Sequence, residues 1–184
     1  YGEFYEKRWF APSSNLNSNS VYVLGQEVPV GANLLFRDKT RNDVCFGVEI
    51  CEDLWAVTSP SDSLAKSGAT LIFNLSSSNE VIGKYQYRKN LVSVKSSLTM
   101  TGYIYASSGI NESTTDLVFS GHTMIYENGT LLAEGERFKL DSDLIYNDVD
   151  VQRLANLRRR NTSFMGVKAD FSYRYIDVVV RKSK

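Results

Sequence analysis

The sequence has little of what metal-dependent and histidine-dependent hydrolases use. It contains a single histidine, His122, and two cysteines. It therefore holds no His-x-x-x-His pair, and it has no Cys-x-x-Cys pair, so the usual zinc-ligand spacings are missing. A Ser-His-Asp triad would have only that one histidine to draw on. Zinc-dependent hydrolysis and histidine-based acyl transfer are disfavoured.

Net charge and long apolar runs are also missing. The 21 Lys and Arg residues balance 21 Asp and Glu residues, and the sequence pI is about 6.8. Bulk attraction to a nucleic acid or to an anionic membrane is therefore not expected. No run of about 18 apolar residues marks a membrane span, and the first residues lack the pattern of a signal peptide. We expect a cytoplasmic protein with neither a nucleic acid nor a membrane as partner.

The length of the chain, its first residues and its two cysteines predict its domain organisation and the redox state of its thiols. With 184 residues and 42% hydrophobic content, residues 1–184 are expected to form one globular domain. Its start, Tyr1–Phe10, is aromatic and charged and lacks Met, which we interpret as part of a longer polypeptide. Cys45 and Cys51 lie in one predicted strand, about 20 Å apart, whereas a disulfide needs roughly 4.4–6.8 Å between Cα atoms. We expect free thiols, as in a reducing compartment.

Hydrophobic periodicity and turn residues predict both strands and helices. Strands are expected at Val21–Leu24, Leu34–Phe36, Val44–Ile50, Thr70–Leu75, Tyr103–Ser107, Leu117–Phe119, His122–Tyr126, Thr130–Ala133 and Asp143–Asp150, with a tight hairpin at Asn128-Gly129. A helix is expected at Pro60–Lys66, with Gly68 as its C-cap. A second helix is expected from about Glu80 to Met100, with an apolar stripe of Tyr87, Leu91, Val94 and Leu98. A third, short helix is expected around Leu154 and Leu157.

The order of these elements predicts an α/β fold. The strand, helix and strand from Val44 to Leu75 favour parallel pairing, and the later hairpin adds antiparallel pairs. We therefore expect a mixed sheet with Val44–Ile50 and Thr70–Leu75 among its central strands and with helices on one face.

Cys51 lies where a buried strand ends, directly before the acidic pair Glu52 and Asp53. The carboxyl ends of parallel strands are where α/β sheets open a ligand crevice. A nucleophilic thiol needs a base or a cation beside it, and amide cleavage needs donors aimed at the developing oxyanion. Spacing alone favours the simpler interpretation that Cys51 is a small buried side chain.

Several segments, in this order along the chain, resemble the nitrilase (carbon-nitrogen hydrolase) superfamily. Residues 47–55, Gly-Val-Glu-Ile-Cys-Glu-Asp-Leu-Trp, resemble its nucleophile strand and elbow, and the acidic form of the elbow resembles the glutaminase domains of glutamine-dependent NAD synthetases. The other matching segments are Tyr1–Phe10, after the family's catalytic lysine, Asn74–Ser78, the substrate loop, Arg88 in the next helix, and Asp116–Thr123, a hairpin with which the domain folds back. The resemblance runs from residue 1 to about residue 160 and implies part of a nitrilase-like α-β-β-α sandwich.

The resemblance implies a catalytic role for Cys51. In that family the cysteine forms a glutamyl thioester, a glutamate acts as general base and a lysine stabilises the oxyanion. The last two lie upstream of Tyr1, so residues 1–184 alone are expected to be inactive. An additional active-site glutamate of the family corresponds to Glu3, with Glu6 as the alternative.

The resemblance also implies a glutamine pocket. Its lining residues would be Tyr1, Phe4, Glu52, Ser78 and Arg88, with Glu52 facing the substrate ammonium. A zwitterionic substrate needs such an acceptor for its amine. Without the resemblance, a surface ion pair for Glu52, loop solvation for Ser78, and core packing for Tyr1 and Phe4 are the simpler interpretations.

Other residues and partners complete the expectations. Glu49 is interpreted as structural and Arg158–Arg160 as a solvated helix face, while Asp53 and Trp55 stay unassigned. The partners implied are glutamine and a synthetase domain of the same polypeptide that uses ATP and Mg²⁺, with no cofactor in residues 1–184, in a homo-oligomer. The alternatives are a stand-alone amidase of the same fold, which would not need Glu52 for an ammonium, and a non-catalytic interaction module.

Overall fold

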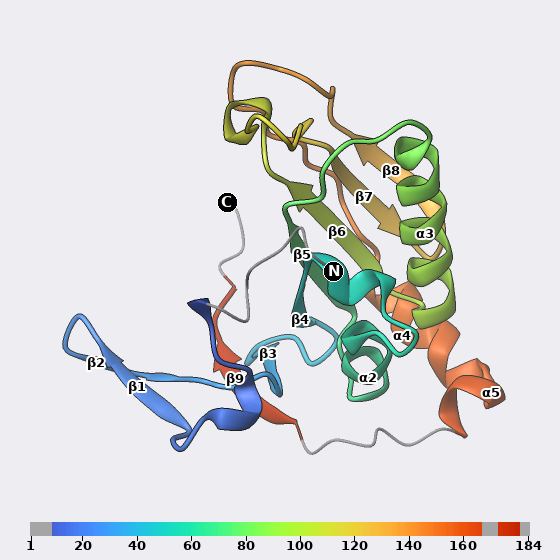
Figure 1. Ribbon diagram of the computed structural model, residues 1–184. Coiled ribbons are helices and arrows are strands. Elements are labelled where there is room, and N and C mark those ends of the chain that lie inside the picture. Colours follow the sequence, from blue (N-terminus) through green and yellow to red (C-terminus); the bar gives the residue numbers. More distant parts are fainter. Residues whose placement is uncertain (1–8, 167–172, 181–184) are drawn as a thin grey trace.

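The computed structural model describes residues 9–166 and 173–180, and within them seven strands form one mixed sheet (Figure 1). The strand order is β8-β7-β6-β5-β4-β3-β9. The strands are β3 (Leu34–Asp38), β4 (Cys45–Ile50), β5 (Leu71–Ser76), β6 (Gly102–Ser107), β7 (Thr123–Glu127), β8 (Thr130–Glu134) and β9 (Arg174–Val178). β4, β5 and β6 are parallel, and β7 and β8 form the antiparallel hairpin. The predicted α/β fold with a mixed sheet and central strands β4 and β5 is confirmed.

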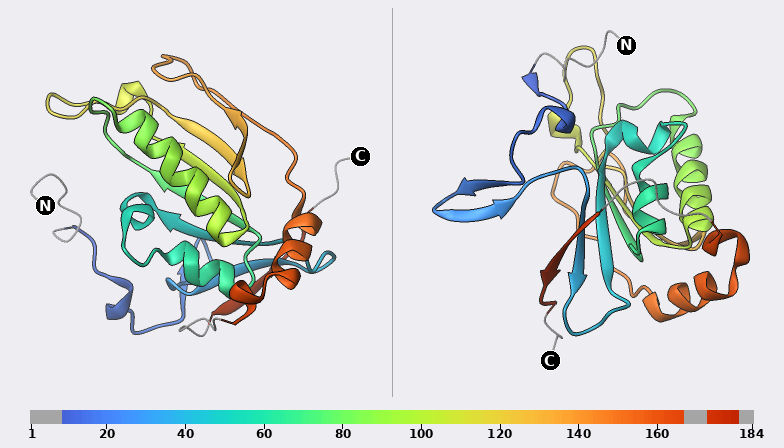
Figure 2. Two further views of the ribbon diagram at one scale, coloured as in Figure 1. Left: turned by 90° about the vertical axis from the view of Figure 1, so that its right-hand side faces the viewer. Right: turned by 90° about the horizontal axis from the view of Figure 1, so that it is seen from below.

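Helices α2 (Pro60–Lys66) and α3 (Lys84–Thr99) cover one face of this sheet (Figures 1 and 2). α2 packs on β4 and β5, and α3 packs on β6 and β7. The core between these layers contains Leu64, Ile72, Val92, Tyr103 and Met124. α4 (Val151–Arg160) and the short α5 (Thr162–Met165) follow near the end of the sheet at which β4 and β5 begin.

Local signals explain where α2 begins and ends. Pro60 occupies the first helical position, where its missing N–H costs nothing, and Asp62 Oδ2 accepts a hydrogen bond from the Ser59 N–H at 3.2 Å. Gly68, just beyond the end, has φ +113°, a conformation that favours glycine. The predicted bounds of this helix are confirmed.

The predicted buried stripe on α3 is wrong, although the helix itself forms. Tyr87, Val94 and Leu98 are more than half exposed. The helix instead buries Arg88, Val92, Ser96 and Thr99, which recur at steps of four, four and three. Polar side chains can turn inward here because they find partners: Ser96 Oγ donates to Thr101 O at 2.7 Å, and Arg88 pairs with Glu80.

Two predicted strands are absent from the described part of the chain. Around Leu117–Phe119 the backbone bonds to neighbouring loops, since Val118 O accepts from the Glu80 N–H and the Phe119 N–H donates to Ser113 Oγ. Residues 143–150 are not in a strand either; a side-chain hydrogen bond joins Asn147 to Leu132 O of β8. Apolar, β-branched runs predict extended backbone but do not specify a partner strand.

Within residues 9–166 and 173–180, no helix covers the other face of the sheet, and apolar side chains are exposed there. Val48, Ile50 and Leu75 are 40%, 64% and 59% exposed. The described residues thus form one helical layer and one large sheet of the four layers that an α-β-β-α sandwich contains. None of the helices in the described ranges is long and apolar enough to cross a membrane.

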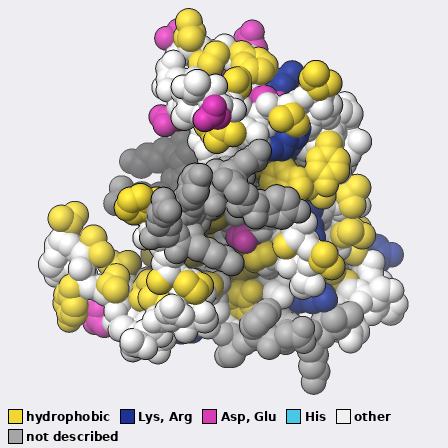
Figure 3. Space-filling view, viewed as in Figure 1, with side chains coloured by type: hydrophobic (Ala, Val, Ile, Leu, Met, Phe, Trp, Pro, Cys, Tyr) yellow, Lys and Arg dark blue, Asp and Glu magenta, His cyan; other side chains and the backbone are white. Residues whose placement is uncertain are grey.

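A two-stranded arm projects from the body of the molecule (Figure 1). It consists of β1 (Ser20–Val23) and β2 (Gln26–Pro29), paired antiparallel. Hydrophobic side chains gather on it (Figure 3), among them Tyr22 and Leu24, which are 78% and 99% exposed. The strand predicted at Val21–Leu24 is therefore present, but it lies outside the main sheet.

Candidate active site

Cys51 lies at the carboxyl end of β4, as the first residue of the 3-10 helix η2 (Cys51–Trp55). Its φ is +48°, in the left-handed region, which a residue with a Cβ occupies at a cost of roughly 1–3 kcal/mol. Its side chain is a free, partly exposed thiol. Strained residues of this kind persist only where their surroundings fix them, and they cluster at functional sites.

Side chains on both sides of Cys51 fix the elbow. Asp53 Oδ2 accepts a hydrogen bond from the Ile50 N–H at 2.8 Å, and Asn74 Nδ2 lies 3.5 Å from Cys51 O. Leu54 is 1% exposed, and Trp55 packs against the core. Asp53 and Trp55, unassigned from the sequence, therefore hold the turn that presents the thiol.

Cys45 differs from Cys51 although both lie at ends of the same strand. It is 4% exposed and free, as predicted from the spacing of the two thiols. Burial raises the pKa of the Cys45 thiol to about 11, which leaves it protonated and unreactive at neutral pH. Of the two thiols, Cys51 is the one that solvent and a substrate can reach.

Glu49 lies two residues before Cys51 and is 2% exposed. Its Oε2 accepts hydrogen bonds from the Ser61 N–H at 2.8 Å and from Ser59 Oγ at 2.9 Å. Its Oε1 accepts from the hydroxyl of Tyr103. Burial, and then the charge of Glu49, raise the pKa of Tyr103 far above its usual range. The structural role expected of Glu49 fits these contacts.

Glu52 and Ser78 lie at the same end of the sheet as Cys51, because all three follow the carboxyl ends of the parallel strands β4 and β5. Glu52 is exposed and has no ion pair among the described residues. Ser78 is buried, and its N–H donates to Ser107 Oγ at 3.3 Å. Their roles as glutamine ligands stay predictions. Tyr1, Glu3, Phe4 and the alternative Glu6 lie outside the described residues.

Arg88 is fully buried. Its Nη1 donates to Glu80 Oε1 at 2.7 Å and approaches His122 Nδ1 at 3.0 Å. Among the described residues, its Nε and Nη2 have no hydrogen-bond partner, and its guanidinium carbon is 5.9 Å from the centre of the Tyr105 ring. The predicted role of Arg88 as a substrate ligand stays a prediction.

The ionic network around Arg88 was missed from the sequence. His122 Nε2 lies 3.0 Å from Glu134 Oε1, and Glu134 Oε2 accepts from Lys89 Nζ at 2.6 Å. Burial lowers the pKa of His122, so the buried imidazole is neutral. The residues of this network come from separate segments of the chain, and only Arg88 and Lys89 are adjacent in the sequence. No spacing in the sequence indicates that they meet.

Arg158 corrects the prediction that the three arginines of α4 form a solvated face. It is 7% exposed and donates to backbone oxygens of Ala69 at 2.6 Å, Thr99 at 3.0 Å and Met100 at 3.1 Å. Carbonyls at the end of a helix lack intrahelical partners, so the guanidinium satisfies the end of α3. Burial lowers the pKa of Arg158 to about 10. Arg159 and Arg160 are exposed, as predicted.

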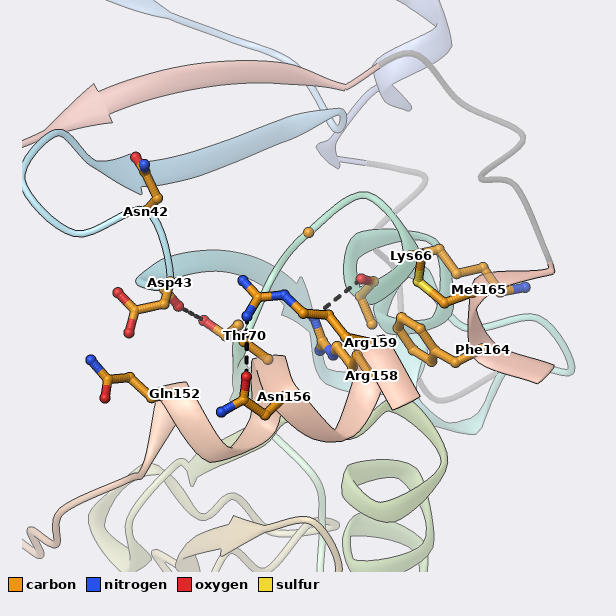
Figure 4. A pocket seen from close by; sticks show the side chains of 13 residues that line it. Asn42, Asp43, Lys66, Thr70, Gln152, Asn156, Arg158, Arg159, Phe164 and Met165 are labelled. Atoms are coloured by element: carbon orange, nitrogen blue, oxygen red, sulfur yellow. Dashed lines mark hydrogen bonds between the residues drawn. The ribbon is translucent and has the colours of Figure 1, made fainter. Parts of the chain in front are cut away.

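Arg158 also lines a cavity of about 570 Å³ (Figure 4). Asp43 and Thr70, just before β4 and β5, line it as well, so it lies at the end of the sheet opposite Cys51. Because the hydrogen bonds of Arg158 go to backbone carbonyls, we interpret this residue as a structural clamp rather than as a ligand.

A strained, partly exposed cysteine at the carboxyl end of a parallel strand agrees with the resemblance noted in the sequence. The family model described as carbon-nitrogen hydrolase matches residues 3–159. The chain belongs to the carbon-nitrogen hydrolase family.

Relatives of this carbon-nitrogen hydrolase chain are glutamine-dependent NAD(+) synthetases. That of Mycobacterium tuberculosis is 40% identical over 164 residues, covering 89% of this chain and 24% of the relative. That of Homo sapiens is 30% identical over 194 residues, covering 93% of this chain and 26% of the relative. The chain therefore spans about a quarter of the length of these relatives.

A solved structure of a glutamine-dependent NAD(+) synthetase also resembles this chain. The crystal structure of a glutamine-dependent NAD(+) synthetase from Cytophaga hutchinsonii superposes with a TM-score of 0.58 at 28% identity, covering 72% of this chain and 20% of that one. The predicted membership of the nitrilase superfamily is confirmed, and the chain corresponds to part of a larger protein.

Proposed function

We propose that this carbon-nitrogen hydrolase chain supplies the nucleophile and part of the substrate pocket of a glutaminase within a glutamine-dependent NAD synthetase. The observation that carries the proposal is the strained elbow at Cys51, at the carboxyl end of β4, in a chain that is 40% identical to such a synthetase. Exposure of the Cys51 thiol and burial of Cys45 support the choice of nucleophile.

The reaction would proceed through a thioester. The Cys51 thiol gives its proton to a general base, and Sγ attacks the carboxamide carbon of glutamine. The tetrahedral intermediate collapses as the C–N bond breaks, and the leaving nitrogen takes up that proton to give ammonia. Water then adds to the thioester carbon, the C–S bond breaks, and glutamate and the free thiol result. The base and the lysine for the oxyanion come from upstream of Tyr1, as the family resemblance implies.

Specificity would come from the residues beside the elbow. Glu52 is exposed and unpaired within the described ranges, so its carboxylate is available to the ammonium of glutamine. A charge-assisted pair of this kind favours glutamine over simple amides. Ser78 follows β5 at the same end of the sheet and would line the pocket, together with Tyr1, Phe4 and Glu3 from the segment before the described residues.

The ammonia would serve a synthetase domain of the same polypeptide, which would use ATP and Mg²⁺ to amidate deamido-NAD. The relatives' greater length leaves ample room for such a domain. A stand-alone amidase would share Cys51 but would not need Glu52, and an interaction module would need neither.

Labelling of the complete protein with a glutamine-mimicking electrophile tests the proposal. We expect one label, on Cys51, with glutamine protecting against it, and we expect Cys51→Ala to abolish both labelling and glutamine hydrolysis. Cys45→Ala is the matched control, because that thiol lies on the same strand but is buried, and it should retain both. Labelling that glutamine does not slow would favour a different amide, and absence of labelling would favour the interaction module.

A further inference from the structure

The carboxylate of Glu49 is placed at unusual cost for a purely structural group. It is 2% exposed, yet no cation pairs with it among the described residues. Its hydrogen-bond donors are neutral: Ser61 N–H and Ser59 Oγ at the start of α2, the Tyr103 hydroxyl of β6 and, at 3.5 Å, Asn74 Nδ2 of β5. A buried charge without a counter-charge is expensive. Here both oxygens accept hydrogen bonds, which a neutral amide with one acceptor oxygen could not do, so the carboxylate fixes the donors on both sides of it.

The contacts of Glu49 lead to the nucleophile through two further side chains. Because the Tyr103 hydroxyl donates to Glu49, its oxygen is available as an acceptor, and Asn74 Nδ2 lies 3.2 Å from it. The same Nδ2 lies 3.5 Å from Cys51 O. Glu49, Asn74 and Tyr103 all face the helical layer, on three adjacent strands.

The orientation of the Asn74 amide is dictated by this cluster. Glu49 Oε1 and Cys51 O are acceptors on one side of it, so the amide nitrogen must face them. Asn74 Oδ1 is left buried and finds no hydrogen-bond partner in the part of the chain that the structure describes. An unsatisfied buried acceptor costs about 1–3 kcal/mol. That this cost is tolerated indicates that the contacts of Asn74 Nδ2 matter more to the fold than a hydrogen bond to Asn74 Oδ1 would.

From this geometry we propose that Glu49 is a positioning residue for Cys51, acting through Tyr103 and Asn74. The three side chains hold the Cys51 carbonyl, and with it the plane of the peptide that follows the nucleophile. Since Cys51 has φ +48°, the elbow relaxes unless such contacts fix it, and its thiol then loses its direction. The expected effect on catalysis rests on the proposed function, in which the Cys51 thiol attacks glutamine. The expected effect on the orientation of the thiol does not.

The test uses Tyr103→Phe and Glu49→Gln in the complete protein, with alkylation quantified by mass spectrometry on the peptide that contains Cys51. We measure kcat and KM for glutamine, the rate of Cys51 alkylation by iodoacetamide, and Tm. For Tyr103→Phe we expect kcat to fall by about 10-fold, as for other small misplacements of a reacting group, with KM unchanged and alkylation slowed. Glu49→Gln should change both rates in the same direction.

Tyr126→Phe is the matched control. Tyr126 is a buried tyrosine on β7 that pairs across the sheet with Tyr103 but, among the described residues, makes no hydrogen bond to Glu49 or Asn74, so removing its hydroxyl should affect Tm but neither rate. Wild-type kcat and alkylation in Tyr103→Phe, or an equal fall in Tyr126→Phe, would overturn the proposal. If the wild-type protein does not hydrolyse glutamine, the proposed function fails, and the alkylation rates alone decide whether Glu49 positions Cys51.

Discussion

Arg88 and His122 are hydrogen-bonded to each other in the interior, with Arg88 Nη1 3.0 Å from His122 Nδ1. A guanidinium only donates, so His122 Nδ1 must accept and its proton must lie on Nε2, which donates to Glu134 Oε1. Both residues are fully buried. Protonation of His122 would place a second cation against Arg88, which explains why the neutral imidazole is favoured.

Stability should therefore fall as the pH drops below the ordinary pKa of histidine. Burial lowers the pKa of His122 from 6.5, so below that pH the unfolded chain binds more protons than the folded one. The contribution is complete above pH 6.5 and decreases towards lower pH by at most about 1.4 kcal/mol per pH unit. Glu80 and Glu134, whose pKa values are lowered from 4.5, contribute only at more acidic pH.

Denaturant unfolding at about pH 7.5 and pH 5.5 measures this effect. Because His122 is the single histidine of the sequence, His122→Gln should be less stable than wild type at the higher pH but should lose much less on acidification. Equal stability of the wild-type protein at the two pH values would show that His122 does not titrate between folded and unfolded states.

Arg158→Met should lower the free energy of unfolding by about 2–4 kcal/mol, because carbonyls of Ala69, Thr99 and Met100 lose a buried charged donor. Arg159→Met is the control on the same helix. Its guanidinium is exposed, and the change should stay within about 0.5 kcal/mol. Chemical denaturation of both variants measures the difference, and similar losses in the two would contradict the clamp.

Residues 1–184 alone should show no measurable glutaminase activity. The family resemblance implies that the general base and the lysine lie upstream of Tyr1, and catalytic groups of this type act as a unit rather than additively. Ammonia release from glutamine by the purified polypeptide is the measurement. Turnover that Cys51→Ala abolishes would mean that the base and the oxyanion donor are supplied from within these residues.

Glu52→Gln in the complete protein should impair the use of glutamine far more than the use of free ammonia. If glutamine binding desolvates the pair, its loss should cost on the order of 2–5 kcal/mol, or about one and a half to three and a half decades in kcat/KM for glutamine, whereas a pair that stays as exposed as Glu52 is here would cost much less. Ammonia-driven synthesis would take place in the other domain and should stay near its original rate.

NAD formation with glutamine and with ammonium as alternative nitrogen donors separates these effects, with Cys51→Ala measured in parallel. Cys51→Ala should abolish only the glutamine-driven reaction. An unchanged kcat/KM for glutamine in Glu52→Gln would remove Glu52 from the ammonium site and leave Cys51 as nucleophile.

The sequence by itself determined the main elements and the position of the candidate nucleophile. Pro60 and Gly68 bound a helix because they restrict or permit backbone conformations locally, and Asn128-Gly129 forms a tight hairpin for the same reason. The family resemblance located the elbow at Cys51, because the matching strand end, thiol and acidic turn are contiguous in the chain, whereas spacing alone favoured a buried side chain. Signals of this kind need no information about distant segments.

Only the tertiary structure decided which polar groups are buried and what they contact. Arg158 has the same local sequence context as its exposed neighbours Arg159 and Arg160. It becomes a clamp only because the backbone carbonyls at the end of α3 and just before β5 accept hydrogen bonds from it. Likewise, Arg88 faces inward, where Tyr87 was expected, because Glu80 and His122 supply partners. Burial of a charge depends on partners brought from far along the chain, and local periodicity carries no record of them.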